Sequence, residues 1–249
     1  MVFFLNWYIL KCNVIVISIN KLRNWGEKNK MDFDFIKEQI PLYIEGAKLT
    51  LTIGSLGIIF SIIIGMLCSI TTYFKIPILG KLVSVYIELA RNTPLLIQLY
   101  FLYFGLPKVG IVLSATSCAI IGLTFLGGSY MAEVLRSGLE SIEKIQIETA
   151  LSLGMKRIQV FFNIILSQAI SNSIPAFCAN IIFLIKETSV LSIVALADLM
   201  FVTKELIGIY YKTDEALFML VISYLMILLP ISIGCTFLER RVRYAEYGD

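Results

Sequence analysis

Four consecutive polar residues, Lys186-Glu187-Thr188-Ser189, interrupt a stretch that is apolar on both sides. Ionisable side chains at membrane depth are costly, and they usually face a cavity or a partner chain. Lys186 can meet a carboxylate and Glu187 an amino group, so the pair could hold a ligand that carries both. We predict that these four residues line a path through a membrane. The alternative is that Lys186 and Glu187 form an interfacial ion pair at a helix end.

A second candidate site lies within residues 141–167, a run in which charged and apolar residues alternate. The apolar spacing predicts a short helix, and Gly154 can adopt the left-handed conformation that ends one. Residues 155–162 then begin a helix in a new direction. The predicted apolar face of the first helix comprises Ile145, Ala150, Leu151 and Leu153.

This helix-glycine-helix elbow combines a small residue with exposed charges, which suits docking into a groove of a partner protein. An amphipathic linker lying on the membrane surface is the alternative. The residues predicted to make the docking contact are Glu148, Ala150, Gly154, Met155 and Lys156.

The composition of the chain indicates which class of fold positions these residues. The 249-residue chain is 58% hydrophobic and only 16% charged, whereas soluble domains carry about 25% charged residues. It is therefore predicted to be an all-α polytopic membrane protein. The five cysteines lie far apart without a C-x-x-C pair, which predicts small buried side chains rather than a disulfide framework.

Catalytic chemistry is not expected in this chain. The sequence has no histidine and no G-x-x-x-x-G-K-[ST] loop, so it lacks the commonest general base and the usual ATP-phosphate cradle. We predict no catalytic residue, no metal and no cofactor here. Any ATP and magnesium must be bound by a separate ATPase subunit.

The first 30 residues are predicted to be untranslated leader, with the protein starting at Met31. Trp25-Gly26-Glu27 requires purine-rich codons that resemble a ribosome-binding site shortly before Met31. The alternative is an additional N-terminal hydrophobic segment. Residues 31–48 are predicted to form an amphipathic segment on the outer surface.

Residues 49–243 are predicted to contain about five membrane-spanning helices. The first covers 49–74 and carries small residues at helical spacing, which let a second helix approach closely. In the second, Glu88 and Arg91 are three residues apart, which favours a local ion pair over the alternative of a role in substrate binding, and Pro94 either opens or kinks the span. The third span covers 111–135 and ends in a Glu133–Arg136 pair, and the membrane-crossing part of the fourth span starts at Pro175. A short re-entrant or gate helix over 190–202, an outer loop over 203–215 and a last span over 216–238 follow.

The distribution of basic residues predicts the orientation. Most lysines and arginines fall on the side that carries residues 141–167 and the C-terminal cluster, and that side should be cytoplasmic. The N-terminus of a chain that starts at Met31 is then outside and the C-terminus inside.

Three motifs resemble one family. Glu148-Thr149-Ala150, Gly154, Ile164 and Leu166 reproduce the spacing of the cytoplasmic loop of ABC importer permeases, although Thr149 and Ser167 replace the usual Ala and Pro. The strings YIELARNTPLLIQLYFLYFGLP and SYMAEVLRSGLESI are similar to those of the polar amino-acid group of these permeases.

The resemblance implies the type I ABC importer permease fold, with residues 141–167 as the coupling loop. It also implies the partners: a cytoplasmic ABC ATPase dimer, a second permease subunit in a homo- or heterodimer, and an extracytoplasmic solute-binding protein. The implied substrate is a polar amino acid of the glutamine, arginine, histidine or cystine class, carried across a bacterial cell membrane. An ion-coupled secondary transporter is an alternative that usually shows inverted repeats, and a membrane scaffold subunit is another.

Overall fold

The computed structural model describes residues 31–247, with side chains described as far as residue 242, so the predictions for residues 1–30 lie outside this range. Within it the chain consists of helices joined by short turns, without strands. The elements are α2 (Phe33–Tyr73), α3 (Pro77–Asn92), α4 (Leu95–Tyr100), η1 (Phe101–Gly105), η2 (Leu106–Val109), α5 (Ala115–Glu140), α6 (Lys144–Ser152), α7 (Arg157–Val160), η3 (Phe161–Ile165), α8 (Leu166–Glu187), η4 (Thr188–Val194), α9 (Leu199–Tyr210) and α10 (Thr213–Tyr247).

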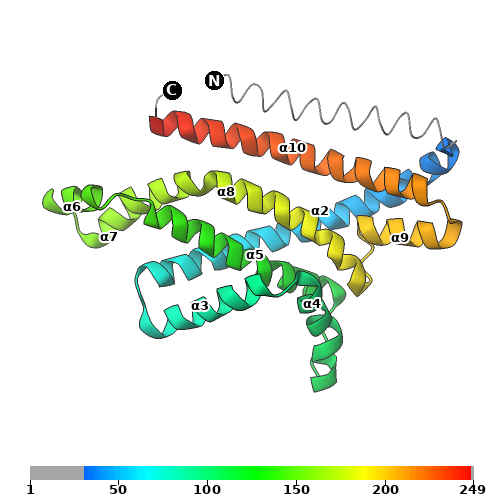
Figure 1. Ribbon diagram of the computed structural model, residues 1–249, viewed down its shortest axis with the longest axis horizontal. Coiled ribbons are helices and arrows are strands. Elements are labelled where there is room, and N and C mark those ends of the chain that lie inside the picture. The colour runs from blue at the N-terminus through cyan, green and yellow to red at the C-terminus, as the bar shows by residue number, and fades with distance from the viewer. Residues whose placement is uncertain (1–30, 248–249) are drawn as a thin grey trace.

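Four helical stretches of the described chain are long and apolar enough to cross a membrane, and a shorter apolar one covers Leu95–Val109. The long stretches are Phe33–Tyr73, Ala115–Glu140, Arg157–Val194 and Thr213–Val242. In Figure 1, α2, α5, α8 and α10 run along the length of the molecule, with α6 and α7 at one end and α9 at the other. The prediction of an all-α polytopic membrane protein is confirmed.

The first helix, α2, is continuous, so residues 33–48 and the predicted first span belong to one helix. Asp32 caps its start by accepting hydrogen bonds from the backbone N–H groups of Asp34 and Phe35. Further along, the Tyr43 hydroxyl donates to the backbone oxygen of Ala216 at 2.8 Å. Because Phe35 and Tyr43 are buried against α9 and α10, the first turns of α2 belong to the helical bundle.

Small residues bring α2 into close contact with α5, as predicted. A Cβ atom added at Gly57 would lie 2.9 Å from Leu123 Cβ, and one added at Gly65 would lie 2.5 Å from Met131 Cβ. Between them, the buried Ser61 hydroxyl donates to the Gly57 backbone oxygen at 2.7 Å and lies 3.3 Å from that of Leu123. We call this contact between α2 and α5 the small-residue seam.

Pro94 opens a helix rather than kinking one. It is the N-cap residue of α4, and Thr93 before it has an extended backbone that ends α3. A proline disfavours the helical conformation in the residue that precedes it, so the chain breaks here. The predicted second span is therefore divided between α3 and the shorter helical stretch that begins at Leu95.

Pro175, predicted to start the membrane-crossing part of the fourth span, lies inside α8, which begins at Leu166. Further along, the structure differs from the prediction. The expected gate helix over 190–202 and outer loop over 203–215 are replaced by η4 and α9. Thr203 and Leu206 are buried, so the charged residues between them belong to the exposed face of a packed helix.

Candidate functional site

The elbow predicted around Gly154 is present. Gly154 has a φ of +87° and follows α6. Its N–H donates to the Leu151 backbone oxygen at 3.0 Å, and the Met155 N–H donates to that of Ala150 at 3.2 Å. These two bonds form the Schellman motif that closes a helix C-terminus, and its left-handed position favours glycine.

A new helix begins directly after this turn. The Lys156 N–H donates to Gln159 Oε1 at 2.9 Å, which satisfies one of the free backbone donors at the start of α7. Ala150 of α6 is buried together with Ile142 and Val160, so the two arms of the elbow share a small apolar core. Ala150, predicted to take part in the docking contact, therefore lies inside the elbow rather than on its surface.

The outer surface of the elbow is apolar although nothing in the described chain covers it. The side chains of Ile145 and Leu153 are 63% and 79% exposed, and Ile158 is also exposed. Glu148 and Lys156 are exposed beside them. Figure 1 shows α6 and α7 at one end of the molecule. Exposed apolar side chains among charges are typical of a protein-protein contact.

The polar break between α8 and η4 lies where it was predicted. The α-helix ends at Glu187 and a tighter helix starts at Thr188. Lys186 is exposed and Glu187 and Ser189 are half-buried, but Thr188 is fully buried and its hydroxyl donates to the Ile185 backbone oxygen at 2.7 Å. Thr188 therefore does not line an open surface. Within the described range neither Lys186 nor Glu187 has an ion-pair partner, which argues against the interfacial pair.

The connection after η4 contains a buried charge that sequence reasoning missed. Asp198 is completely buried, and its Oδ1 accepts the Phe201 N–H at 3.0 Å to cap α9. Its Oδ2 has no hydrogen-bond partner in the described chain. Ala195, three residues earlier, has a φ of +55°, a strained value for a residue with a side chain. Both features lie in residues 190–202, a run that is apolar apart from Ser192 and Asp198.

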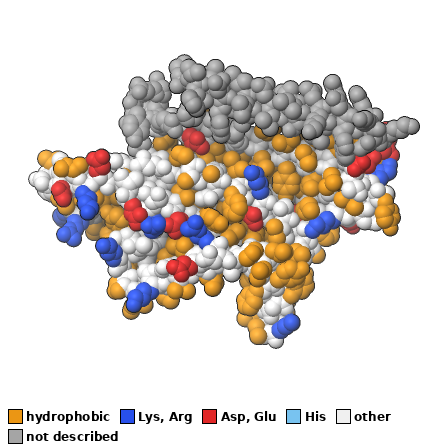
Figure 2. Space-filling view, in the orientation of Figure 1, with side chains coloured by type: hydrophobic (Ala, Val, Ile, Leu, Met, Phe, Trp, Pro, Cys, Tyr) orange, Lys and Arg blue, Asp and Glu red, His pale blue; other side chains and the backbone are white. Residues whose placement is uncertain are grey.

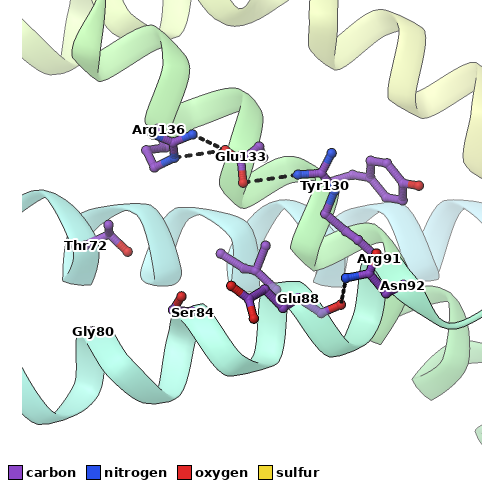
Figure 3. A pocket seen from close by; sticks show the side chains of 10 residues that line it. Thr72, Gly80, Ser84, Glu88, Arg91, Asn92, Tyr130, Glu133 and Arg136 are labelled. Carbon is purple, nitrogen blue, oxygen red and sulfur yellow. Dashed lines mark hydrogen bonds and ion pairs between the residues drawn. The ribbon is translucent and has the colours of Figure 1, made fainter.

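A second missed feature is a cavity of about 470 Å³ between α3 and α5, which we call the ionic cavity. Figure 3 shows acidic and basic side chains from both helices converging on it. Its volume lies within the range of about 300–1,000 Å³ typical of small-molecule sites. The residues that line it are Thr72, Gly80, Ser84, Ile87, Glu88, Arg91, Asn92, Tyr130, Glu133 and Arg136.

The charges of the ionic cavity pair between helices rather than only along them. Arg91 Nη1 lies 3.2 Å from Glu133 Oε2, so the predicted Glu88–Arg91 pair is wrong. The predicted Glu133–Arg136 pair is confirmed, with Arg136 Nε donating to Glu133 Oε1 at 2.9 Å. Arg136 also donates to both carboxylate oxygens of Glu140 at 2.8 and 2.9 Å. The spacing of charges along one helix could not reveal the contact between α3 and α5.

Aromatic side chains connect the ionic cavity to α8. The Arg91 guanidinium carbon lies 5.3 Å from the centre of the Tyr130 ring, a cation-π distance. The Tyr130 ring in turn lies 5.2 Å from that of Phe183, one helical turn before Lys186. A continuous set of contacts therefore runs from the polar break to the ionic cavity.

This charged face is partly exposed in the described structure. Glu133 and Arg136 lie toward the C-terminal end of α5, and the side chains of Arg91 and Glu133 are 41% and 30% exposed. Figure 2 shows charged side chains crossing a surface that is elsewhere largely apolar. Charged side chains of membrane-spanning proteins usually lie against water or protein rather than lipid.

Comparisons with known proteins give one family. The family described as "Binding-protein-dependent transport system inner membrane component" matches residues 57–244. The probable glutamine ABC transporter permease protein GlnP of Bacillus subtilis (strain 168) is 37% identical over 171 residues, which cover 68% of this chain and 78% of the relative. The glutamine transport system permease protein GlnP of Escherichia coli (strain K12) is 32% identical over 216 residues, which cover 86% of this chain and 99% of the relative.

Solved structures share the fold. A crystal structure of an amino acid ABC transporter with histidines superposes with a TM-score of 0.80 and 29% identity, covering 85% of this chain and 99% of the other. An inward-facing MetNI methionine ABC transporter has a TM-score of 0.68 at 21% identity, covering 82% and 98% of the two chains.

Proposed function

Since the chain belongs to the family of binding-protein-dependent transport system inner membrane components, we propose that it forms one half of the path by which an ATP-driven importer carries a polar amino acid. Its membrane-spanning helices and its family make it a transport subunit of the inner membrane. The observation that carries the proposal is the charged face between α3 and α5, on a molecule whose elbow exposes apolar residues.

The path is formed by the polar break and the ionic cavity together. Lys186, Glu187 and Ser189 begin it on α8, and the Phe183–Tyr130 contact leads to the charges between α3 and α5. Both signs of charge are present along this face, which suits a ligand with an amino and a carboxyl group. Thr188, which we expected in the path, stabilises the helix break instead.

The elbow is the coupling element of the proposal. Its exposed apolar residues and the charges of Glu148 and Lys156 enter a groove of a cytoplasmic ABC ATPase dimer, with Gly154 and Met155 setting the angle between the arms. ATP and magnesium are bound by that partner. Closure of the ATPase pair displaces the elbow and the spans attached to it, and so couples hydrolysis to opening of the path.

The assembly contains further partners. A second permease subunit, identical or related, covers the charged face and completes the path, and an extracytoplasmic solute-binding protein delivers the amino acid. The elbow and the C-terminal basic residues lie in the cytoplasm, and the start of α2 lies outside. Relatives named as glutamine permeases make glutamine the first substrate to test, followed by arginine, histidine and cystine.

Transport by the reconstituted complex tests this proposal. The permease and the ATPase that co-purifies with it are placed in proteoliposomes with the solute-binding protein, and uptake of each radiolabelled amino acid is measured. ATP-dependent uptake that persists after an ionophore collapses the ion gradients is expected. Uptake driven by an ion gradient without ATP would identify a secondary transporter, and a chain that neither binds an ATPase nor transports would be a scaffold.

Two substitutions separate the roles of the two sites. Glu148→Lys at the elbow is expected to leave membrane insertion intact but to abolish substrate-stimulated ATP hydrolysis, because the docking contact is lost. Glu187→Gln is expected to change the KM or selectivity of uptake while the ATPase stays bound. Normal uptake by Glu148→Lys would remove the coupling role, and unchanged transport kinetics in Glu187→Gln would make Glu187 structural.

A further inference from the structure

The ionic cavity is lined by two carboxylates, Glu88 and Glu133, and by two guanidinium groups, Arg91 and Arg136. Arg91 and Arg136 both bind Glu133, and Arg136 also binds Glu140, so these two arginines are already engaged by two carboxylates. Glu88 is the other carboxylate that lines the cavity. Among the residues that the structure describes, no cation lies within ion-pairing distance of Glu88. The Asn92 side-chain amide donates a hydrogen bond of 2.8 Å to the backbone oxygen of Glu88, so this bond does not occupy the Glu88 carboxylate.

The Glu88 carboxylate lies where a ligand in the cavity can contact it. Figure 3 shows Glu88 and Arg91 on α3 and Glu133 and Arg136 on α5 around the cavity, with Arg91 reaching Glu133. Glu88 is exposed, so a ligand can reach its carboxylate, and a bound cation would supply the counter-ion that the described residues do not. Arg91 is held by a single ion pair of 3.2 Å and stays partly exposed, so an incoming carboxylate can also reach it.

We propose that the ionic cavity is a binding site for the carried amino acid, in which Glu88 binds the α-ammonium group and Arg91 the α-carboxylate. This rests on the proposed function as an amino-acid permease. The two groups are common to every amino acid, so the site recognises the main-chain part of the substrate and leaves the side chain to the remaining volume. The cavity lies between α3 and α5 toward the end of the molecule that bears the elbow (Figure 1), so the bound substrate is near its point of release.

Equilibrium binding to the assembled permease–ATPase complex in nanodiscs, without nucleotide, tests the site. L-Glutamine is the first probe, replaced by whichever amino acid the uptake assay selects. Glu88→Gln should weaken its binding at least tenfold, whereas Glu88→Asp should recover part of the affinity. The matched control is Glu205→Gln, an exposed carboxylate on α9 that does not line the cavity, and it should bind as the unmodified complex does.

A second probe identifies the group that Glu88 binds. N-acetyl-L-glutamine keeps the carboxylate but has no ammonium, so it should bind weakly and equally to the unmodified complex and to Glu88→Gln. Full affinity for L-glutamine in Glu88→Gln, or an equal loss for both probes, would overturn the assignment. If the unmodified complex transports no amino acid, the proposed function is wrong. If it transports an amino acid and Glu88→Gln binds that amino acid with unchanged affinity, only the proposed site is wrong.

Discussion

Replacing Gly154 by alanine isolates the contribution of the elbow's backbone. A Cβ at this position would meet no atom within 4 Å, so alanine adds no steric clash with neighbouring residues. The φ of +87° is nevertheless in the left-handed region, which costs a residue with a side chain about 1–2 kcal/mol. An energy of that size corresponds to roughly a 5- to 30-fold change in a two-state equilibrium. Gly154→Ala should therefore lower the equilibrium constant between elbows with the correct angle and other arrangements by about that factor.

The assay is substrate-stimulated ATP hydrolysis by the assembled complex. Asparagine tolerates the left-handed conformation better than alanine does, so stimulation should decrease in the order Gly154, Gly154→Asn, Gly154→Ala. The matched control is Gly208→Ala, because Gly208 is an exposed glycine inside α9 where an added Cβ would also meet no atom within 4 Å, but where the backbone is helical. It should leave stimulation unchanged. Equal stimulation in Gly154→Ala and the unmodified complex would refute the reasoning, as would a larger loss for asparagine than for alanine.

Three further predictions concern the stability of the bundle, each measured by thermal unfolding in detergent. Gly65→Ala should lower the free energy of unfolding by about 1–3 kcal/mol, because its Cβ would lie 2.5 Å from that of Met131; an unchanged transition would show that the small-residue seam can relax. Tyr43→Phe should cost about 1 kcal/mol through the lost hydrogen bond to the α10 backbone, and no change would mean that water replaces it. The pKa of the Asp32 carboxyl lies below its ordinary value of 3.8, mainly because of the Lys212 ammonium and secondly because of the backbone N–H groups at the start of α2. Asp32 therefore stabilises the fold above that pH, and this stabilisation is lost as the pH falls through its folded pKa. The stability difference between the unmodified protein and Asp32→Asn should accordingly narrow on acidification below a pH of 3.8, and a difference that is constant with pH would contradict the pairing.

Features determined by neighbouring residues in the chain could be predicted from the sequence. Gly154 followed a short amphipathic run, and a helix end at such a glycine depends only on local backbone chemistry. The break at Pro94 is local for the same reason. The small residues of α2 also predicted a close helix contact, although the sequence did not say that α5 would provide the partner.

Features that depend on contacts between distant segments could not be predicted in the same way. Arg91 is three residues from Glu88, yet it pairs with Glu133 on another helix. Thr188 has the same polar character as Ser189, but packing against the bundle buries it. The region of α9 appeared to be a charged loop because its buried residues, such as Thr203 and Leu206, are separated by exposed charges. In each case tertiary packing decides which of several locally reasonable arrangements occurs.

The small-residue seam limits how the protein can move. Two helices whose backbones approach this closely, with side chains of one filling the space left by glycines of the other, cannot slide past one another without steric overlap. α2 and α5 should therefore travel as one rigid lever during a transport cycle, with bending confined to the turns at their ends. Spin labels on these two helices should keep a constant separation in every nucleotide state, while labels on the two halves of the transporter move apart and together.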